Sequence, residues 1–286
     1  MTDKKKKTLL RNSFEVFIRT LFFLTMPAAF SSGFLGVKLI FNAIGAGEPI
    51  NIDRIWVLAG LLVFTIIFGR FFCGFVCAFG TLGDLVYFIS GVVQKKLFKR
   101  KKQIAIPEKA SAVLQKLKYI ILFAVVMLCL FGIYSKLSGI SPWDVFSRFM
   151  ILKLPTSDYI IGIILFALII IGMAFKKRFF CRFLCPMGAI FSLLPVLPFS
   201  RIHRDESNCI KGCQACKMNC PVHIKPGEDI LGEGECISCE KCMNICPKKN
   251  LTRPERRIIK NDIVLLLVKA AIFFVMGIFL GLFRFI

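Results

Sequence analysis

The chain has 286 residues, of which 56% are hydrophobic, and it carries a formal net charge of +22. A soluble domain does not usually combine so much apolar sequence with so much charge, whereas a membrane protein with apolar spans and basic cytoplasmic loops does. The Lys and Arg residues flank apolar stretches and are not interleaved with aromatic residues, which argues against a nucleic-acid partner.

Several apolar stretches are long enough to cross a bilayer, which takes about 17–25 residues. The expected spans lie within Phe14–Ile44, Ile55–Phe72, Tyr119–Tyr134, Tyr159–Phe175 and Ile263–Phe285. The first is interrupted by Pro27, Gly33 and Gly36. Two further apolar pieces, Phe79–Val93 and Met187–Leu197, are short, and we interpret them as interfacial or re-entrant helices.

The distribution of Lys and Arg among the short loops predicts the orientation. The chain begins "MTDKKKK", residues 94–118 are heavily basic, and "KKR" at 176–178 closes the fourth span, whereas loops 45–54 and 139–158 are sparse or mixed in charge. The positive-inside rule therefore places the N-terminus, the basic linker and the segment after the fourth span on the cytoplasmic side of the inner membrane.

A short phrase occurs twice, at an offset of 108 residues. "RFFCGFVCAFG" fills residues 70–80 and "RFFCRFLCPMG" fills residues 178–188. Each copy follows the second span of a two-span unit, so the sequence predicts a parallel repeat about an axis along the membrane normal. Such an axis would bring four cysteines together at the cytoplasmic edge of the bilayer: Cys73, Cys77, Cys181 and Cys185.

A second cysteine-rich region lies between the fourth and fifth spans. "CISCEKCMNICP" has the C-x2-C-x2-C-x3-C-P spacing of bacterial ferredoxins, in which three thiolates hold one cluster and the fourth reaches the other. "CIKGCQACKMNCP" has the same form, except that its first gap is three residues. By the crossing rule, one [4Fe-4S] cluster takes Cys209, Cys213, Cys216 and Cys246, and the other takes Cys236, Cys239, Cys242 and Cys220.

Zinc and disulfides are weaker interpretations of these two runs. Zinc sites use separated C-x2-C pairs, and disulfides are disfavoured on a cytoplasmic face. The four repeated cysteines leave two interpretations open. Their i, i+4 spacing would place each pair on one face of a continuing helix, so four thiolates could hold a third iron–sulfur centre beside Arg70, Arg178 and Arg182. Buried structural thiols are the alternative, and we assign Cys129, inside the third span, to the core.

Other residue types narrow the chemistry. Only His203 and His223 are present and neither lies in a span, which excludes an intramembrane bis-histidine haem. Neither G-x-G-x-x-G nor a P-loop occurs, so no dinucleotide or ATP site is recognisable. Trp143 and Asp144 could line a quinone site on the outer side, but we favour an interfacial turn with an aromatic anchor.

The expected fold is an all-α polytopic membrane protein with about five spans, an internal parallel two-fold repeat and an inserted α+β ferredoxin-like domain. The predicted parts are a first membrane repeat at 1–93, a basic cytoplasmic linker at 94–118, a second membrane repeat at 119–200, a two-cluster ferredoxin-like domain at 201–255 and a C-terminal span at 260–286.

Paired membrane motifs ending in "CRFLCPMG", followed by two ferredoxin runs, resemble the NapH/NosR-type membrane ferredoxin family over roughly residues 14–250. The resemblance implies a four-span core, two cytoplasmic [4Fe-4S] clusters, paired C-x3-C-P motifs, and electron transfer between the quinone pool and a partner redox protein. The chain departs from the family in three ways. Ala78 replaces the Pro of the first motif, which weakens the ligand role of Cys73 and Cys77. A fifth span follows the ferredoxin segment, and no flavin-attachment domain is recognisable.

We therefore expect a membrane-bound iron–sulfur protein that passes electrons between a cytoplasmic partner and the membrane, meaning the quinone pool or the subunits of a partner redox enzyme, as in a quinol dehydrogenase. Its basic cytoplasmic face should attract an acidic electron carrier such as a ferredoxin or flavodoxin. The alternative is a membrane metal-ion reductase or an assembly factor for a metalloenzyme, for which Met150 in an outward loop is the only spare ligand. A cluster-bearing redox sensor would need an output domain, and none is recognisable.

Overall fold

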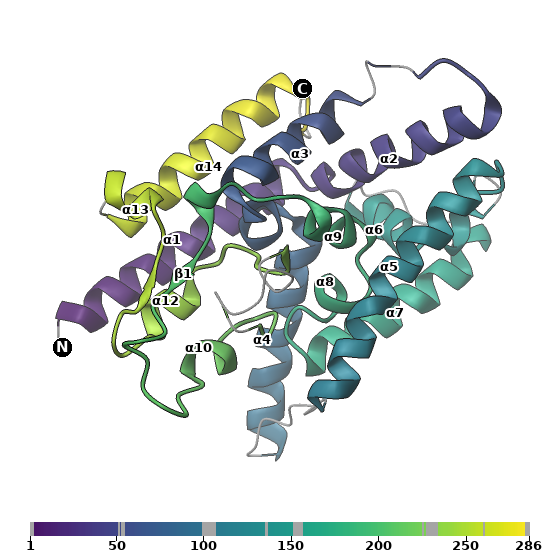
Figure 1. The fold of residues 1–286 in the computed structure, drawn as a ribbon. Helices are drawn as coiled ribbons and strands as arrows, with labels where there is room; N and C mark the ends of the chain where they lie inside the picture. Colours follow the sequence, from purple (N-terminus) through teal and green to yellow (C-terminus); the bar gives the residue numbers. More distant parts are fainter. Residues whose placement is uncertain are drawn as a thin grey trace.

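The computed structural model describes residues 3–50, 52, 55–98, 107–134, 137–150, 157–224, 226, 234–259 and 261–283. Within these ranges the chain is mostly helical, with one two-stranded sheet. In Figure 1, α1 and α14 lie together on one side of the molecule and α5 and α7 on the other, with α8 and α9 between them.

The helices before the ferredoxin segment fall into two sets, one for each copy of the repeated phrase. The first set is α1 (Asp3–Thr25), α2 (Ala29–Ala46), α3 (Trp56–Phe68), the π-helical turn η2 (Phe72–Val76) and α4 (Ala78–Phe98). The second set is α5 (Glu108–Leu130), η3 (Ser138–Ile140), α6 (Pro142–Met150), η4 (Ser157–Tyr159), α7 (Ile160–Phe175), α8 (Phe179–Phe183), α9 (Pro186–Leu193) and η5 (Pro198–Ser200).

Among the residues that the structure describes, three helices are long and apolar enough to cross a membrane by length and composition: α2, residues 110–130 of α5, and α14 (Asp262–Phe279). The expected second and fourth spans correspond to α3 and α7, which are shorter apolar helices of 13 and 16 residues. The expected first span is two helices, because the chain turns at Pro27 between α1 and α2. The expected basic linker is largely helical, since α4 continues to Phe98 and α5 begins at Glu108; residues 99–106 lie outside the described ranges.

Phenylalanine rings bring the two copies of the repeated phrase together. The rings of Phe79 and Phe180 stack with centroids 4.1 Å apart, and the Phe72 ring meets Phe191 edge-on at 5.8 Å. Phe273 of α14 joins the same core by packing against Phe72. Burying such large apolar rings is the main favourable term in packing, so this core fixes the two cysteine-bearing turns relative to each other.

The ferredoxin segment is a small α+β unit that starts and ends at one sheet. Strand β1 (His203–Arg204) pairs antiparallel with β2 (Leu251–Thr252), with His203 opposite Thr252. The helices α10 (Ala215–Met218) and α12 (Lys241–Ile245) lie between the strands, and α13 (Glu255–Ile258) leads from the unit into α14. Residues 227–233, between the two cysteine runs, are outside the described part of the chain.

Candidate iron–sulfur sites

We call Cys220, Cys236, Cys239 and Cys242 the inner ferredoxin group. The thiols of these four residues lie within electrostatic reach of one another. The pKa of Cys242 is raised by burial and by the neighbouring thiols of Cys236, Cys239 and Cys220. Burial and the thiols of Cys239 and Cys236 raise the pKa of Cys220 to about 12. Four converging sulfur donors from two ferredoxin runs fit the thiolate set of a [4Fe-4S] cluster.

The outer ferredoxin group consists of Cys209, Cys213, Cys216 and Cys246, and all four are half-buried. The side chains of Cys216 and Cys246 pack against the small core of the segment. Cys209 and Cys213 lie in the loop before α10, and the Cys209 Sγ accepts a hydrogen bond from Arg204 at 3.4 Å. In the described ranges, no three Cys, His, Asp or Glu side chains are arranged in the geometry of a bound metal ion.

The membrane-edge group consists of Cys73, Cys77, Cys181 and Cys185. Each pair would share one face if its helix continued, but the helix breaks at the second cysteine of each pair. Cys77 lies between η2 and α4, and Cys185 lies between α8 and α9. The backbone nevertheless repeats closely: Cys77 N donates to Phe72 O at 2.8 Å, and Cys185 N donates to Phe180 O at 2.9 Å.

Each of these breaks gives a thiol a hydrogen-bond donor at the start of a helix. Gly188 N donates to Cys185 Sγ at 3.2 Å, and the Gly80 backbone N–H is placed in the same way toward Cys77. A helix N-terminus and an N–H donor both favour a thiolate. Ala78 begins α4 just as Pro186 begins α9, so the missing proline does not alter this arrangement.

The four membrane-edge thiols are buried and lie outside the candidate spans. Burial raises the pKa of Cys185 well above its ordinary value, and the thiols of Cys181, Cys73 and Cys77 add to the effect. A set of mutually repelling buried thiols needs cations or a metal before it can ionise. The residues therefore fit an iron–sulfur centre, provided that positive charge is close.

Two buried arginines supply that charge in a reciprocal way. Arg178 Nη1 donates to Cys73 O at 2.6 Å, and its Nη2 makes an ion pair with Asp84 at 2.7 Å. The Arg178 guanidinium occupies the place where a side chain at Gly80 would project, and Arg70 lies 3.1 Å from the corresponding position at Gly188. Each copy of the phrase thus packs its arginine over the glycine of the other copy.

The membrane-edge group touches the loop that carries the inner ferredoxin group. A side chain at Gly74 would overlap the carbonyl oxygen of Ile237, so only glycine allows this approach. Arg70 Nη1 donates to Gly234 O at 2.9 Å and pairs with Glu235 at 3.4 Å, directly before Cys236. The two groups of thiols are therefore adjacent.

Lys118 and Glu235 form a buried ion pair that sequence reasoning missed. Lys118 belongs to the stretch that we interpreted as a basic linker, where a lysine looks like a topology signal only. Its partner is 117 residues away in the chain, so no local pattern could reveal the pair.

Glu240, inside the inner cysteine run, is a second missed residue. Its carboxylate accepts from Arg11 of α1 at 3.2 Å, from Arg253 at 3.3 Å and from Arg256 at 3.2 Å. Burial alone would raise the pKa of Glu240, but Arg253, Lys269 and Arg11 lower it to about 2. This network joins the cluster loop to α1 and α13.

An apolar cavity of about 470 Å³ lies between α5, α6, α7 and α8. Phe180, which precedes Cys181, and Leu184, which precedes Cys185, line one part of it, and Trp143 and Tyr134 line another. Trp143 is buried, so the expectation of an interfacial anchor is wrong. Its Nε1 donates to Tyr134 OH at 3.1 Å. The Tyr134 hydroxyl in turn donates to Asp144 at 3.2 Å.

Comparisons with known proteins identify relatives of this chain. The sequence model of a protein family described as "4Fe-4S binding domain" matches residues 54–104 and 160–199, which contain the two copies of the phrase. The uncharacterized protein MJ0749 of Methanocaldococcus jannaschii is 35% identical over 191 residues, which cover 67% of this chain and 67% of that protein.

Two named relatives are more distant. The putative electron transport protein YccM of Escherichia coli is 28% identical over 193 residues, covering 66% of this chain and 52% of YccM. The ferredoxin-type protein NapH of Haemophilus influenzae is 25% identical over 206 residues, covering 66% of this chain and 63% of NapH. No solved structure gives a significant match.

Proposed function

This chain belongs to the NapH/NosR-type family of membrane ferredoxins, and we propose that it carries electrons through three thiol-bound iron–sulfur centres between the cytoplasm and the membrane. It is a membrane iron–sulfur electron-transport protein. In this proposal the outer ferredoxin group, the inner ferredoxin group and the membrane-edge group each hold one centre. Bound clusters would supply one-electron redox chemistry, and the protein would set their potentials and spacing.

The observation that carries the proposal is the contact between Gly74 and Ile237. It places the membrane-edge group against the loop of the inner group with no side chain between their backbones. Arg70 spans the same junction, since it bonds Glu235 and lies within electrostatic reach of Cys73 and Cys185. Short separations of this kind are what a series of electron-transfer centres needs.

The apolar cavity supports a quinone as the redox partner on the membrane side. It is lined mostly by hydrophobic residues of α5, α7 and α8 and includes a few polar groups, the usual composition of a site for an amphipathic small molecule. Lys38 pairs with Asp144 at 3.2 Å, and Asp144 accepts from Tyr134. The Tyr134 hydroxyl, which lines the cavity, would bind the head group, and Asp144 would exchange protons with it through that hydroxyl.

The remaining features of the function are proposals of the same kind. Five spans, a parallel two-fold repeat, a cytoplasmic N-terminus and a cytoplasmic ferredoxin segment in the inner membrane are supported by the charge distribution and by the reciprocal arginine packing. The cytoplasmic partner would be an acidic carrier, such as a ferredoxin or flavodoxin, or a redox enzyme subunit. Metal-ion reduction, or a role as an assembly factor for a metalloenzyme, remains the alternative function.

The third centre is tested by iron content. We expect the double variant Cys181→Ser/Cys185→Ser to lose iron and one redox signal while both ferredoxin-type signals persist. Cys129→Ser is the matched control, because Cys129 is buried but stands apart from the three groups. Equal iron in the double variant, the control and the wild type would show that the membrane-edge thiols only pack.

A further inference from the structure

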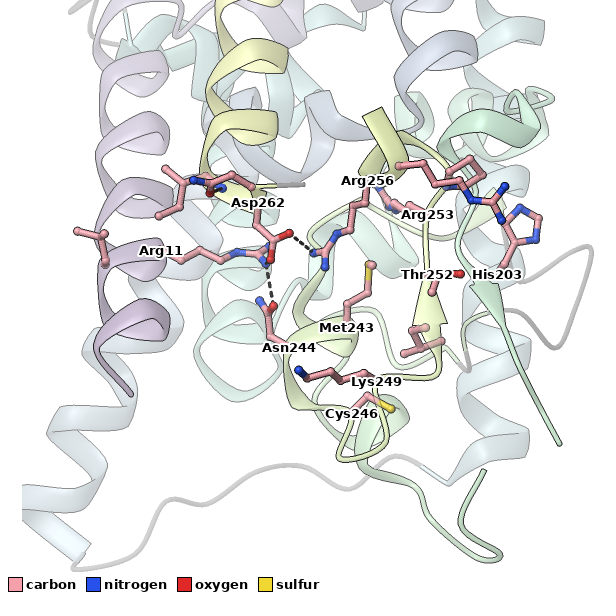
Figure 2. A pocket seen from close by; sticks show the side chains of 16 residues that line it. Arg11, His203, Met243, Asn244, Cys246, Lys249, Thr252, Arg253, Arg256 and Asp262 are labelled. Atoms are coloured by element: carbon pink, nitrogen blue, oxygen red, sulfur yellow. Dashed lines mark hydrogen bonds and ion pairs between the residues drawn. The ribbon is translucent and has the colours of Figure 1, made fainter. Parts of the chain in front are cut away.

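A groove of about 1310 Å³ lies between the ferredoxin segment, α1 and the start of α14. Figure 2 shows its walls: Arg11 on one side, Met243 and Asn244 on the cluster segment, and Arg256 and Asp262 where the segment leads into α14. It is larger than the apolar cavity between α5, α6, α7 and α8.

The lining of this groove is basic. Its cations are Arg11, Lys249, Arg253, Arg256 and Arg257, and Asp262 is the only carboxylate among the described lining residues. Arg11 and Arg256 are held by Asp262, at 3.4 and 3.1 Å. Lys249 and Arg257 make no ion pair with any described residue, so their charge is available to a partner.

The groove also reaches a predicted cluster ligand. Cys246 of the outer ferredoxin group lines it, and Lys249 N donates to Cys246 O at 3.3 Å. Lys249 adopts a positive φ of 53°, a conformation that side-chain-bearing residues adopt rarely. The turn after Cys246 thus places a cation and a cluster ligand side by side on one wall.

We propose that this groove is the docking site of a small acidic one-electron carrier protein, which exchanges its electron with the outer ferredoxin group at Cys246. The inference rests on the proposed function and adds where and through which cluster the cytoplasmic carrier connects. Carboxylates of the carrier would pair with Lys249 and Arg257. One electron moves in each encounter: the carrier is oxidised as the outer centre is reduced, or the reverse, and no bond or proton is exchanged.

Charge complementarity favours a carrier over other occupants. Attraction between a basic groove and an acidic protein speeds encounter and depends on ionic strength. An anionic lipid headgroup could also bind arginines near the start of a span. Headgroup binding would not explain why the groove extends to Cys246. Lipid binding is therefore treated as an outcome of the test.

The test uses the full-length protein in nanodiscs of neutral phosphatidylcholine, with a reduced acidic flavodoxin as the carrier. The variant is Lys249→Glu/Arg257→Glu, and the matched control is Lys95→Glu/Lys96→Glu, the same charge change on α4 outside the groove. We expect the groove variant to lower the second-order rate of cluster reduction at least tenfold at low salt, with the difference shrinking as salt is added. The control should stay near the wild type.

Photoreduced lumiflavin, a small neutral donor, separates docking from damage to the cluster. If the proposal is right, it reduces the wild type, the control and the groove variant equally. The proposal is overturned if the groove variant matches the control with flavodoxin, if lumiflavin reduction falls by the same factor, or if the variant's defect appears only in nanodiscs with anionic lipid. A wild type without ferredoxin-type EPR signals would instead refute the proposed function, before any variant is made.

Discussion

The two ferredoxin groups come from cysteine runs of nearly the same spacing, yet the fold gives them different surroundings. The inner group is covered by η2 on one side and by the network of Glu240 on the other. All four outer thiols are half-buried, whereas Cys239 and Cys242 of the inner group are buried, and Cys246 of the outer group lines the basic groove. The motif sets which thiols converge, but the contacts around it decide whether a centre faces a partner or the next centre.

We expect the largest difference between the two groups when a single cysteine ligand is removed from each. Cys242 belongs to the hydrophobic core of the segment, whereas Cys213 lies in a loop. We expect Cys242→Ser to remove the inner signal and lower the unfolding temperature of the ferredoxin segment, and Cys213→Ser to remove the outer signal with little loss of stability. EPR and thermal unfolding of the two variants measure the difference. An equal drop in unfolding temperature in both variants would mean that the surroundings of the two groups do not differ in their effect on stability.

Glu240→Gln should lower the free energy of unfolding of the ferredoxin segment by about 3–5 kcal/mol, the usual cost of leaving buried charges without their partner. Arg11, Arg253 and Arg256 would all lose their common carboxylate. Chemical denaturation of the holoprotein reports the change. The exposed Glu206 provides the control, and Glu206→Gln should have almost no effect.

Gly74→Ala should disturb the junction between the inner group and the membrane-edge group, at about 1–3 kcal/mol for overpacking. The added methyl would meet the backbone carbonyl of Ile237. The control is Gly83→Ala, whose methyl would meet only the flexible Met173 side chain, 3.3 Å from its sulfur. We expect slower oxidation of the ferredoxin-type centres by a quinone analogue in Gly74→Ala alone. Equal oxidation rates in the two variants would show that the contact between Gly74 and Ile237 does not affect electron transfer.

Arg253→Gln should shift the reduction potential of the inner centre to a more negative value, with a smaller effect on the outer one. Arg253 is 2% exposed and lines a small cavity with Cys236, and its Nε has no hydrogen-bond partner in the described structure. A cation or N–H donor near cluster sulfur favours the reduced state. A tenfold change in that equilibrium corresponds to about 59 mV for one electron. A redox titration monitored by EPR measures this potential. An unchanged or more positive potential of the inner centre in Arg253→Gln would contradict the prediction.

The sequence could predict features that depend on local spacing. The ferredoxin runs predict which thiols share a cluster, and in the structure Cys220 lies within electrostatic reach of Cys236, Cys239 and Cys242. The repeated phrase likewise indicated that its two copies would pack together.

Long-range features were beyond the sequence. Glu240 and Lys118 meet partners more than a hundred residues away, and a charged residue in a basic stretch carries no sign of burial. The burial of Trp143 follows from its contact with Phe34 of α2, which no period in α6 reveals. The break at Cys77 depends on a π-helical turn, and the i, i+4 spacing alone does not tell whether the helix continues there.

The most direct test of the account is the quantity of iron and sulfide per chain in protein purified without oxygen, together with EPR of the reduced form. The account predicts iron clearly above the value of about eight for two cubane clusters, and a third signal that disappears in the Cys181→Ser/Cys185→Ser variant. Iron near eight with two signals would contradict the third centre and leave the protein a membrane-anchored two-cluster ferredoxin.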